Sequence, residues 1–393
     1  MSPPDRNRTP IAWLARSAGI LVCAAFVLAG VTTFGEPPVH TGARPRGPDA
    51  RPVDQRARPD KARGDLFRWR VDSRRPPTPI EEGSTQVQPS ALPFSYAKVR
   101  RKGALRLRRL PTPGERRLIA RAVERGSGWP AVVQKRLVGI FFVALDRPEE
   151  HLGETYYRTV AGRYVLARDL ERVSPPVMRG ERLDEAGELP VAFVFGEDRP
   201  ALCEEEGRLV RCGLVKKHTR FEVADAVKHG ERELVVAPSG RLVERDAVRV
   251  AARIARPAGV SKDARWLHVN LAQQTLVAYE GDEPVFVTLV STGREGHYTP
   301  TGLYRIIEKD VSVTMRGADP DEGWYEVAEV PWTMWYRKYY AVHGAYWHDD
   351  FGTPRSHGCT NLSPGDARWL YRWTASTKSG KNGSWVYFSA EDV

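Results

Sequence analysis

The sequence predicts a mainly β protein that is divided into several domains. Its 393 residues are enough for two or three domains, and the composition, with 41% hydrophobic and 28% charged residues, is that of a globular chain. Apolar and polar residues alternate through most of the C-terminal third, which is typical of strands. Two similar strings in the middle of the chain have the form of β-hairpins. Four cysteines are too few for a disulfide-dense miniprotein.

The amino terminus, residues 1–35, has the form of an export signal. Arginines precede an uncharged and largely apolar stretch, Ser17–Gly35. These 19 uncharged residues are also long enough to stay in the membrane as an anchor, so the sequence leaves cleavage and anchoring open. Lipid modification of Cys23 is disfavoured, because Val22 before it is not small. We therefore expect the chain in the cell envelope, periplasmic or extracytoplasmic, either secreted or anchored by this segment.

Residues 36–85 are expected to form a disordered linker. Nine prolines fall between Glu36 and Gly83, mixed with arginine and aspartate and with hardly any apolar periodicity. Such a chain reaches on the order of 100 Å when mostly extended. It would carry the folded part away from a membrane.

Two related β modules are predicted at 86–175 and 176–260. The string Tyr156–Val165 and the string Leu234–Val243, about 78 residues later, each consist of two apolar runs around a glycine turn. Both modules resemble the bacterial SH3-like modules that accompany cell-wall enzymes. The resemblance implies either binding of wall glycan or peptide, or bracing of a catalytic domain, and the sequence leaves both open.

The positive charge of the chain lies in its front part. The formal net charge is +11, yet the segment from Lys262 to the C-terminus has a net charge of −4. The run Lys98–Arg109 is strongly basic but lacks a recognisable nucleic-acid-binding motif and follows an export signal. We expect it to be a solvated face or to contact an anionic wall polymer or membrane surface, with no nucleic acid as a partner.

Cys203 and Cys212 are predicted to form a disulfide. They lie nine residues apart around Glu204–Gly207, which has the composition of a hairpin tip, and an oxidising envelope permits the bond. The alternative is a pair of ordinary thiols.

The C-terminal segment, 262–390, contains several predicted strands. Leu267, Val269 and Leu271 alternate along the first, and similar alternation returns in Val285–Leu289 and in Leu303–Ile307. A helix is predicted after Ser363, which has the features of an N-cap and is followed by Pro364. We expect the apolar stripe of this helix to pack beneath the loop that holds Cys359.

The stretch from His343 to Asn361 contains the residues of a thiol acyl-transfer site. A cysteine nucleophile needs a base within hydrogen-bond reach, and Cys359 has His343 and His357 as candidates. The amides near Gly358 and Cys359 are candidates for an oxyanion hole. Zinc binding by His343, His348, His357 and Cys359 is the alternative, although the spacing is not that of familiar zinc sites. A third possibility is that the histidines only surround a free thiol.

The motif Ser356-His357-Gly358-Cys359-Thr360-Asn361, with His343-Gly344 sixteen residues before the cysteine, resembles the signature of the L,D-transpeptidase family, with its YkuD-type catalytic domain. Gln274–Leu276, Ser291–Gly293 and Thr299–Gly302 match the same family pattern. The resemblance covers about Lys262 to Phe388. It implies a β-sandwich-like catalytic domain and acyl transfer in peptidoglycan, with no metal or other cofactor.

The resemblance also implies a role for each residue of the motif. Cys359 would be the nucleophile and His343 the general base, with the Gly344 carbonyl orienting the imidazole, while His357 would help to shape the catalytic site. Ser356, Gly358 and Asn361 would contribute to substrate binding. Many family members have arginine where this chain has Asn361, so an arginine contact to a substrate carboxylate is not implied at this position.

The expected function is peptidoglycan cross-linking on tetrapeptide stems, with release of D-alanine. L,D-carboxypeptidase activity and attachment of a protein to the stem peptide remain alternatives within the same chemistry. A wall-binding scaffold with a decayed catalytic domain is the alternative from another class, and the presence of Cys359 and His343 argues against it. The aromatic stretch that includes Trp324 and Tyr325 is expected mainly to pack, although it could border the donor peptide.

Overall fold

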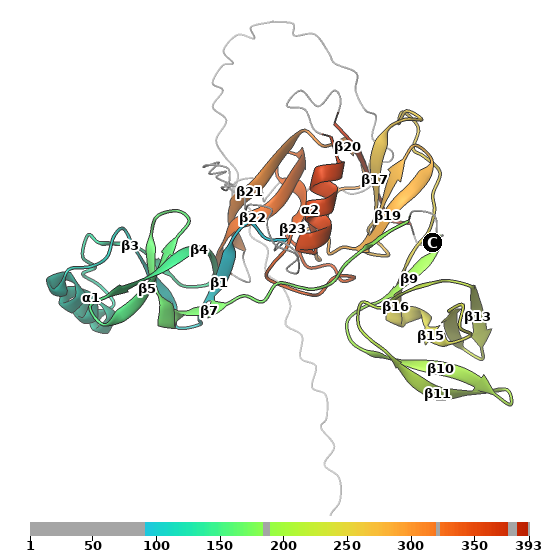
Figure 1. The fold of residues 1–393 in the computed structure, drawn as a ribbon, viewed down its shortest axis with the longest axis horizontal. Helices are drawn as coiled ribbons and strands as arrows, with labels where there is room; N and C mark the ends of the chain where they lie inside the picture. Colours follow the sequence, from blue (N-terminus) through green and yellow to red (C-terminus); the bar gives the residue numbers. More distant parts are fainter. Residues whose placement is uncertain (1–90, 184–188, 320–322, 376–382, 392–393) are drawn as a thin grey trace, which may run out of the picture. The chain divides into compact units, whose positions relative to one another are not determined.

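The computed structural model describes residues 91–183, 189–319, 323–375 and 383–391, and it confirms a mainly β protein (Figure 1). The expected export segment and linker lie outside the described residues. Within the described ranges, no helix is long and apolar enough to cross a membrane. Two α-helices accompany the strands, α1 (Pro113–Arg125) and α2 (Pro364–Trp373).

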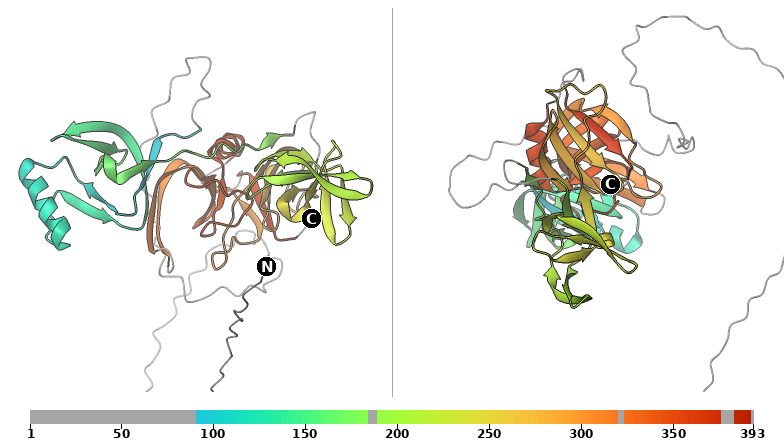
Figure 2. Two further views of the ribbon diagram at one scale, coloured as in Figure 1. Left: turned by 90° about the horizontal axis from the view of Figure 1, so that it is seen from below. Right: turned by 90° about the vertical axis from the view of Figure 1, so that its right-hand side faces the viewer.

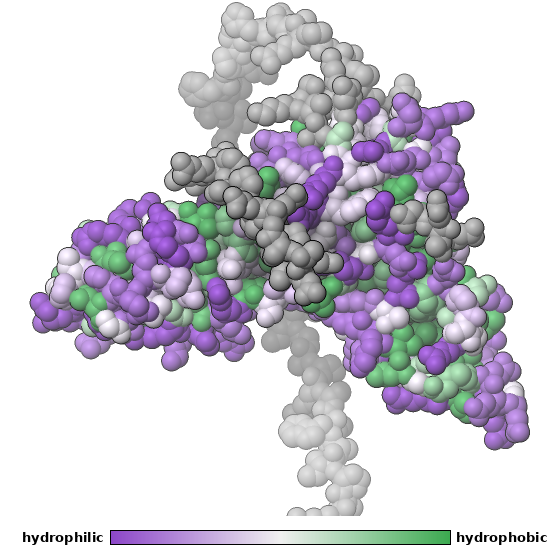
Figure 3. Space-filling model, in the orientation of Figure 1, coloured by the Kyte–Doolittle hydropathy of each residue, from purple (hydrophilic) through white to green (hydrophobic). Residues whose placement is uncertain are grey.

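The first module, defined here as the part of the chain that contains β1 to β7 and α1, is an antiparallel sheet with one helix. Its strands are β1 (Ser95–Val99), β2 (Ala104–Leu107), β3 (Val133–Leu137), β4 (Ile140–His151), β5 (Glu154–Thr159), β6 (Tyr164–Leu166) and β7 (Leu170–Arg172). Helix α1 begins at a capping box of Thr112 and Glu115 and is rich in charged residues, and hydrophilic side chains predominate around it in Figure 3.

The second module, defined here as β9 to β16, consists of a five-stranded and a three-stranded sheet within the described residues. Its strands are β9 (Val191–Val194), β10 (Arg199–Glu205), β11 (Arg208–Val215), β12 (Arg220–Glu222), β13 (Asp225–His229), β14 (Arg232–Val236), β15 (Leu242–Glu244) and β16 (Val248–Ala251). Cys203 on β10 and Cys212 on β11 form a disulfide across this hairpin.

Both hairpins predicted from the repeated strings are confirmed. Strands β5 and β6 pair with Arg158 opposite Tyr164, and strands β14 and β15 pair with Val236 opposite Leu242. In each copy a short 3₁₀ helix follows the hairpin and leads directly into a further strand. The repeated sequence therefore corresponds to a repeated local structure, while the division into two SH3-like modules stays a prediction.

The C-terminal part combines a six-stranded sheet, in the order β20-β25-β17-β18-β19-β8, with the hairpin β21–β22 and the parallel pair β23–β24. Its strands are β17 (Arg265–Asn270), β18 (Thr275–Glu280), β19 (Glu283–Leu289), β20 (Gly302–Arg305), β21 (Glu308–Asp319), β22 (Gly323–Arg337), β23 (Tyr340–Gly344), β24 (Thr360–Leu362) and β25 (Trp385–Ser389). The sixth strand, β8 (Glu181–Arg182), belongs to a segment that we assigned to the second module, yet it pairs with β19.

Strand β17 is buried on both faces. Leu267 and Val269 share one core cluster with Ala367 and Leu370 of α2, as their alternation predicts. Trp266, on the opposite face, packs in another cluster with residues of the second module. The face that holds Trp266, His268 and Asn270 is therefore buried and not exposed to solvent, because a second layer covers it.

Helix α2 begins as predicted, with Ser363 as N-cap accepting a hydrogen bond from the Asp366 amide. The buried Asp366 carboxylate is within hydrogen-bond reach of the Ser363 side chain. It accepts hydrogen bonds from the Gly180 amide at 2.9 Å and the Thr288 hydroxyl at 2.7 Å, which holds the segment before β8 against the helix. The helix contacts β22, β23 and β24 and so supports the strands on either side of Cys359.

The first module and the C-terminal part share one sheet. Strand β4 pairs in parallel with β22, with Tyr325 opposite Ile140 and Val327 opposite Phe142. Figures 1 and 2 show β1 and β4 running alongside the β21–β22 hairpin. This pairing joins residues almost two hundred positions apart, and no local sequence pattern predicts it.

Candidate active site

Cys359 and His343 are brought together by the parallel pair β23–β24. His343 lies in β23 opposite Asn361, and Cys359 immediately precedes β24. Both side chains are almost completely buried and line one cavity of about 340 Å³. The residues between the two strands, 345–359, form a loop that leaves one strand and returns to its neighbour. Strand pairing therefore places the two groups on the same wall of the cavity.

His343 is held in the tautomer of a base. Its Nδ1 lies 3.2 Å from the Gly344 carbonyl oxygen, and because a carbonyl only accepts hydrogen bonds, Nδ1 carries the proton. Nε2 is then left with its lone pair. Burial lowers the pKa of His343 to about 4, so the ring is neutral at neutral pH.

The Cys359 thiol is neutral as well. Burial raises its pKa to about 11, outweighing the Ala341 amide that donates to the sulfur. Sγ also lies 3.7 Å from the Tyr339 carbonyl oxygen, the acceptor for its proton in this arrangement. A neutral thiol and a neutral imidazole suit a general-base mechanism, in which the proton leaves as the sulfur attacks, rather than a preformed thiolate–imidazolium pair.

The protonation states predict a pH profile. Acylation of Cys359 is expected to be flat from about pH 5 to pH 8 and to fall as pH drops through about 4, where His343 takes up a proton and no longer accepts one. Alkylation by iodoacetamide, which needs the thiolate, should be slow near neutral pH and rise about tenfold per pH unit toward the thiol pKa of about 11. Alkylation that is fast and independent of pH around neutrality would show an ion pair instead.

The free energy of unfolding should depend on pH because the pKa of His343 is lowered in the folded protein. The folded-state pKa of about 4 lies below the ordinary value of 6.5, so the folded protein binds fewer protons than the unfolded chain between these values. The contribution of a neutral His343 to the free energy of unfolding is complete above about pH 6.5 and is lost as pH falls toward 4. Urea denaturation across this range would measure the loss.

Ser356 and Gly358 shape the turn before the cysteine. Ser356 Oγ donates to the Cys359 carbonyl and accepts from the Gly358 amide at 3.0 Å. Gly358 has φ of +120°, and a Cβ there would lie 2.8 Å from the Tyr340 ring, so only glycine fits. The Gly358 amide, one of the two donors that we expected in an oxyanion hole, is thus engaged by Ser356.

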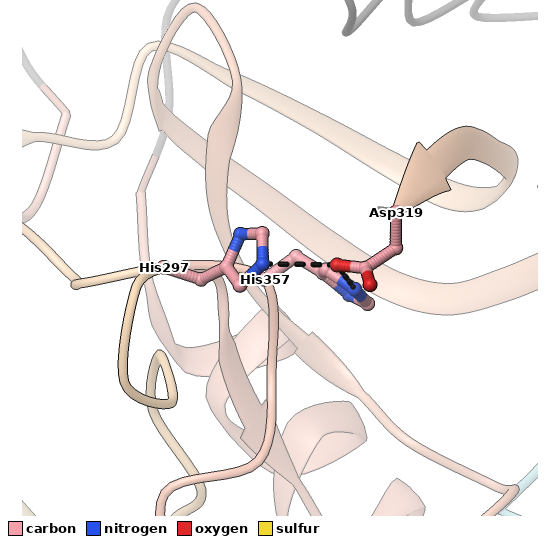
Figure 4. A group of neighbouring side chains, drawn as sticks. All are labelled: His297, Asp319 and His357. Atoms are coloured by element: carbon pink, nitrogen blue, oxygen red, sulfur yellow. Dashed lines mark hydrogen bonds and ion pairs between the residues drawn. The ribbon is translucent and has the colours of Figure 1, made fainter. Parts of the chain in front are cut away.

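His357 belongs to a polar cluster that the sequence did not predict. Its Nε2 lies 3.2 Å from Oδ2 of the buried Asp319, and His297 Nε2 lies 2.9 Å from the same oxygen (Figure 4). Arg294 Nη2 donates to that oxygen at 2.9 Å, and the Tyr325 ring stacks on His357 with a centroid distance of 4.8 Å. His357 is therefore oriented by Asp319 at the end of β21.

The cluster also bears on metal binding. His297, Asp319 and His357 are the one group of potential ligands with suitable spacing in the described part of the chain. However, the Arg294 guanidinium occupies the same carboxylate oxygen and already balances its charge, so a cation would have to displace it. The zinc set considered from the sequence is not assembled, since His343, His348 and His357 each contact a different partner.

Asn361 is held by His348, a histidine that the sequence interpretation considered only as a possible zinc ligand. The Asp350 amide donates to His348 Nδ1 at 3.2 Å, so the proton of this neutral ring is on Nε2, which lies 2.9 Å from the Asn361 carboxamide. The carboxamide oxygen must then accept from Nε2. The NH2 group of the Asn361 carboxamide then takes the second terminal position of the side chain. The atom at this position is buried and has no hydrogen-bond partner in the structure. This leaves a hydrogen-bond donor on the wall of the cavity.

Several cavity residues were not found from the sequence. Arg294 and Arg355 line the cavity beside the motif, and the first module contributes three more residues. Arg294 follows the matched Ser291–Gly293 string directly, a signal that could have identified it. Asp319 has no such signal, because its role depends on where the β21–β22 hairpin comes back to the catalytic loop. Among the aromatic residues that could border the donor peptide, Tyr325 and Trp347 line the cavity, whereas Trp335 and Tyr336 pack in the core.

Comparisons with known proteins find a similar family for the C-terminal part of the chain. Residues 264–387 match the family model of the L,D-transpeptidase catalytic domain. A search of curated proteins finds no match. Residues 264–387 are therefore similar to the catalytic domain of the L,D-transpeptidase family, a family that acts on peptidoglycan stem peptides and is in general extracytoplasmic.

Solved structures with similarity to the chain include three L,D-transpeptidases. A mutant enzyme from Enterococcus faecium is 19% identical, with a TM-score of 0.29, and the match covers 36% of this chain and 55% of that one. An enzyme from Stackebrandtia nassauensis is 25% identical, with a TM-score of 0.25, and the match covers 34% of this chain and 58% of that one. An L,D-transpeptidase from Mycobacterium smegmatis is 19% identical, with a TM-score of 0.28 and coverage of 43% and 82%. The chain thus spans little more than half of the first two.

Proposed function

We propose that this protein is an exported peptidoglycan L,D-transpeptidase that forms cross-links through a cysteine thioester. The observation that carries the proposal is that a neutral thiol and a neutral, correctly protonated imidazole line the same cavity. Cys359 supplies the sulfur, and Nε2 of His343 supplies the lone pair that takes its proton.

The first half of the reaction forms the thioester. As Cys359 Sγ attacks the carbonyl carbon between the third and fourth residues of a tetrapeptide stem, its proton moves to His343 Nε2. The carbonyl oxygen becomes an oxyanion, for which the Cys359 amide and the carboxamide NH2 of Asn361 are the proposed donors. When the intermediate collapses, the C–N bond breaks and His343 returns the proton to the amine of the departing D-alanine.

The second half transfers the acyl group. An acceptor amine attacks the thioester carbonyl, gives a proton to His343 and forms the new amide, while the sulfur leaves and regains a proton from the imidazolium. Water as the acceptor would make the same site an L,D-carboxypeptidase, and an amine of another protein would make it an attachment enzyme.

Product analysis tests the proposal. We expect the purified chain, incubated with a disaccharide-tetrapeptide, to yield cross-linked dimers and free D-alanine by mass spectrometry. Tripeptide without dimers would identify a carboxypeptidase, and unchanged substrate would favour a non-catalytic wall-binding scaffold. A parallel incubation with a chelator serves as a control, because activity that is lost there and restored by zinc would overturn the metal-free mechanism.

A further inference from the structure

We propose that the first module forms part of the substrate-binding site, where Lys98 binds a carboxylate of an anionic peptide substrate. This inference rests on the proposed function, because it concerns the cavity that contains Cys359. It begins from an observation outside the matched segment 264–387, since Lys98, Ile140 and Phe142 line that cavity together with the catalytic pair. Nothing in the resemblance to the catalytic domain places a residue of the first module there.

The first module is docked on the C-terminal part by specific contacts. Tyr96 of β1 stacks on Tyr346 with a centroid distance of 3.7 Å, and its hydroxyl donates to the Glu329 carbonyl at 2.8 Å. At the junction of β4 and β22 the two backbones approach closely. A Cβ on Gly139 would lie 2.6 Å from the Trp324 carbonyl oxygen. These contacts fix the position of β1 and β4 relative to the cavity.

A buried ionic cluster strengthens the docking. Glu326 on β22 is almost fully buried and forms an ion pair with Arg106 of β2 and another with Arg316 of β21. Burial alone would raise the pKa of Glu326, but the hydrogen bonds and charges of the two arginines outweigh it and lower the pKa. The carboxylate is therefore charged at neutral pH and links the first module to the hairpin.

Lys98 stands at the edge of the cavity on this docked strand. In the β1–β4 register it lies opposite Phe142, and its Nζ lies 5.9 Å from the centroid of that ring. Phe142 is buried and faces the cavity, whereas Lys98 is exposed. A cation above an apolar wall suits a peptide that carries a carboxylate on a short aliphatic arm, because the arm packs on the ring while the carboxylate meets the ammonium group.

The other cations of the cavity already have carboxylate partners. Arg294 pairs with Asp319 at 2.9 Å, and Arg355 pairs with Asp350 at 2.9 Å. Lys98, by contrast, forms no ion pair with any carboxylate in the described ranges, although Glu171 lies opposite it on β7. Its charge is therefore the one available to an incoming anion, and no acidic residue lines the described cavity to oppose binding.

The test compares two donor peptides that differ only in one side-chain carboxyl group, which is free in one and amidated in the other. Binding to the full chain carrying Cys359→Ala is measured by calorimetry, and steady-state kinetics are measured with the intact nucleophile. We expect Lys98→Glu to weaken binding and raise KM for the carboxylate form about tenfold or more, with kcat and the amidated peptide little changed. Lys98→Arg should restore most of the affinity. Lys102→Glu, an exposed lysine in the same module, is the matched control for charge.

The possible outcomes distinguish failure of the role proposed for Lys98 from failure of the proposed function. If Lys98→Glu behaves like Lys102→Glu, or weakens both peptides equally, the role of Lys98 is refuted while the proposed function stands. If neither peptide binds and neither is turned over by the unsubstituted chain, both proposals fail. Circular dichroism of each variant shows whether the fold is kept.

Discussion

Replacement of Cys359 by serine is expected to abolish covalent trapping by a carbapenem-type acylating agent and to remove all cross-linked product. A serine hydroxyl is far less acidic than a thiol, and His343 at its lowered pKa of about 4 is too weak a base to activate it. The mass of the intact protein after incubation with the agent measures the effect. The unsubstituted chain should gain the mass of one acyl group and the variant none.

Two further variants make this result specific. His343→Ala should slow acylation by roughly 10²- to 10⁴-fold, the usual contribution of a general base. A Cys203→Ser, Cys212→Ser double variant removes the other described cysteines, which are joined in a disulfide, and should acylate at the original rate. Acyl-enzyme on the Cys359→Ser protein, or its loss in the double variant, would mean that the nucleophile is misassigned.

Tyr346→Ala is expected to be the most destabilising single substitution at the junction of the first module. The side chain is fully buried, its ring packs on Tyr96, and its hydroxyl donates to the Ala328 carbonyl at 2.6 Å. Truncation should leave a cavity and an unpaired carbonyl, at a cost of about 3–5 kcal/mol in the free energy of unfolding. Urea denaturation followed by tryptophan fluorescence measures the change.

The matched variants separate packing from hydrogen bonding. Tyr346→Phe keeps the ring and should cost only about 1 kcal/mol. Trp324→Ala removes a larger side chain that is 65% exposed on the neighbouring strand, and it should change stability by less than about 0.5 kcal/mol. Equal effects of Tyr346→Ala and Trp324→Ala would argue against a packed junction between the first module and the C-terminal part.

The sequence predicted those features that depend on neighbouring residues. The hairpins β5–β6 and β14–β15 follow from alternation around a glycine turn, and helix α2 follows from Ser363 and Pro364. The pairing of Cys203 with Cys212 was also suggested by short spacing. Each of these signals lies within a dozen residues, where chain connectivity limits the possible partners.

The features that were missed depend on distant segments. Strand β4 gives no sign in its own sequence that its edge will pair with β22, and so the place of Lys98 and Phe142 in the cavity could not be inferred. Asp319 was overlooked for the same reason, because its histidine partners come from two other loops. In β17, alternation predicted the correct cluster for Leu267 but not the burial of the opposite face, which depends on a second layer of structure.

The parallel pairing of β23 with β24 has a consequence for how this catalytic centre can change. His343 is fixed by the register of one strand, and Cys359 by the start of the next. The separation of the two reacting atoms is therefore set by the sheet and not by the length of chain that connects them. A change of loop length at the exposed Thr353, before the cavity-lining Pro354 and Arg355, would leave the register of the two strands unchanged. The spacing of sixteen residues therefore depends on the loop, whereas the positions of His343 and Cys359 depend on the two strands.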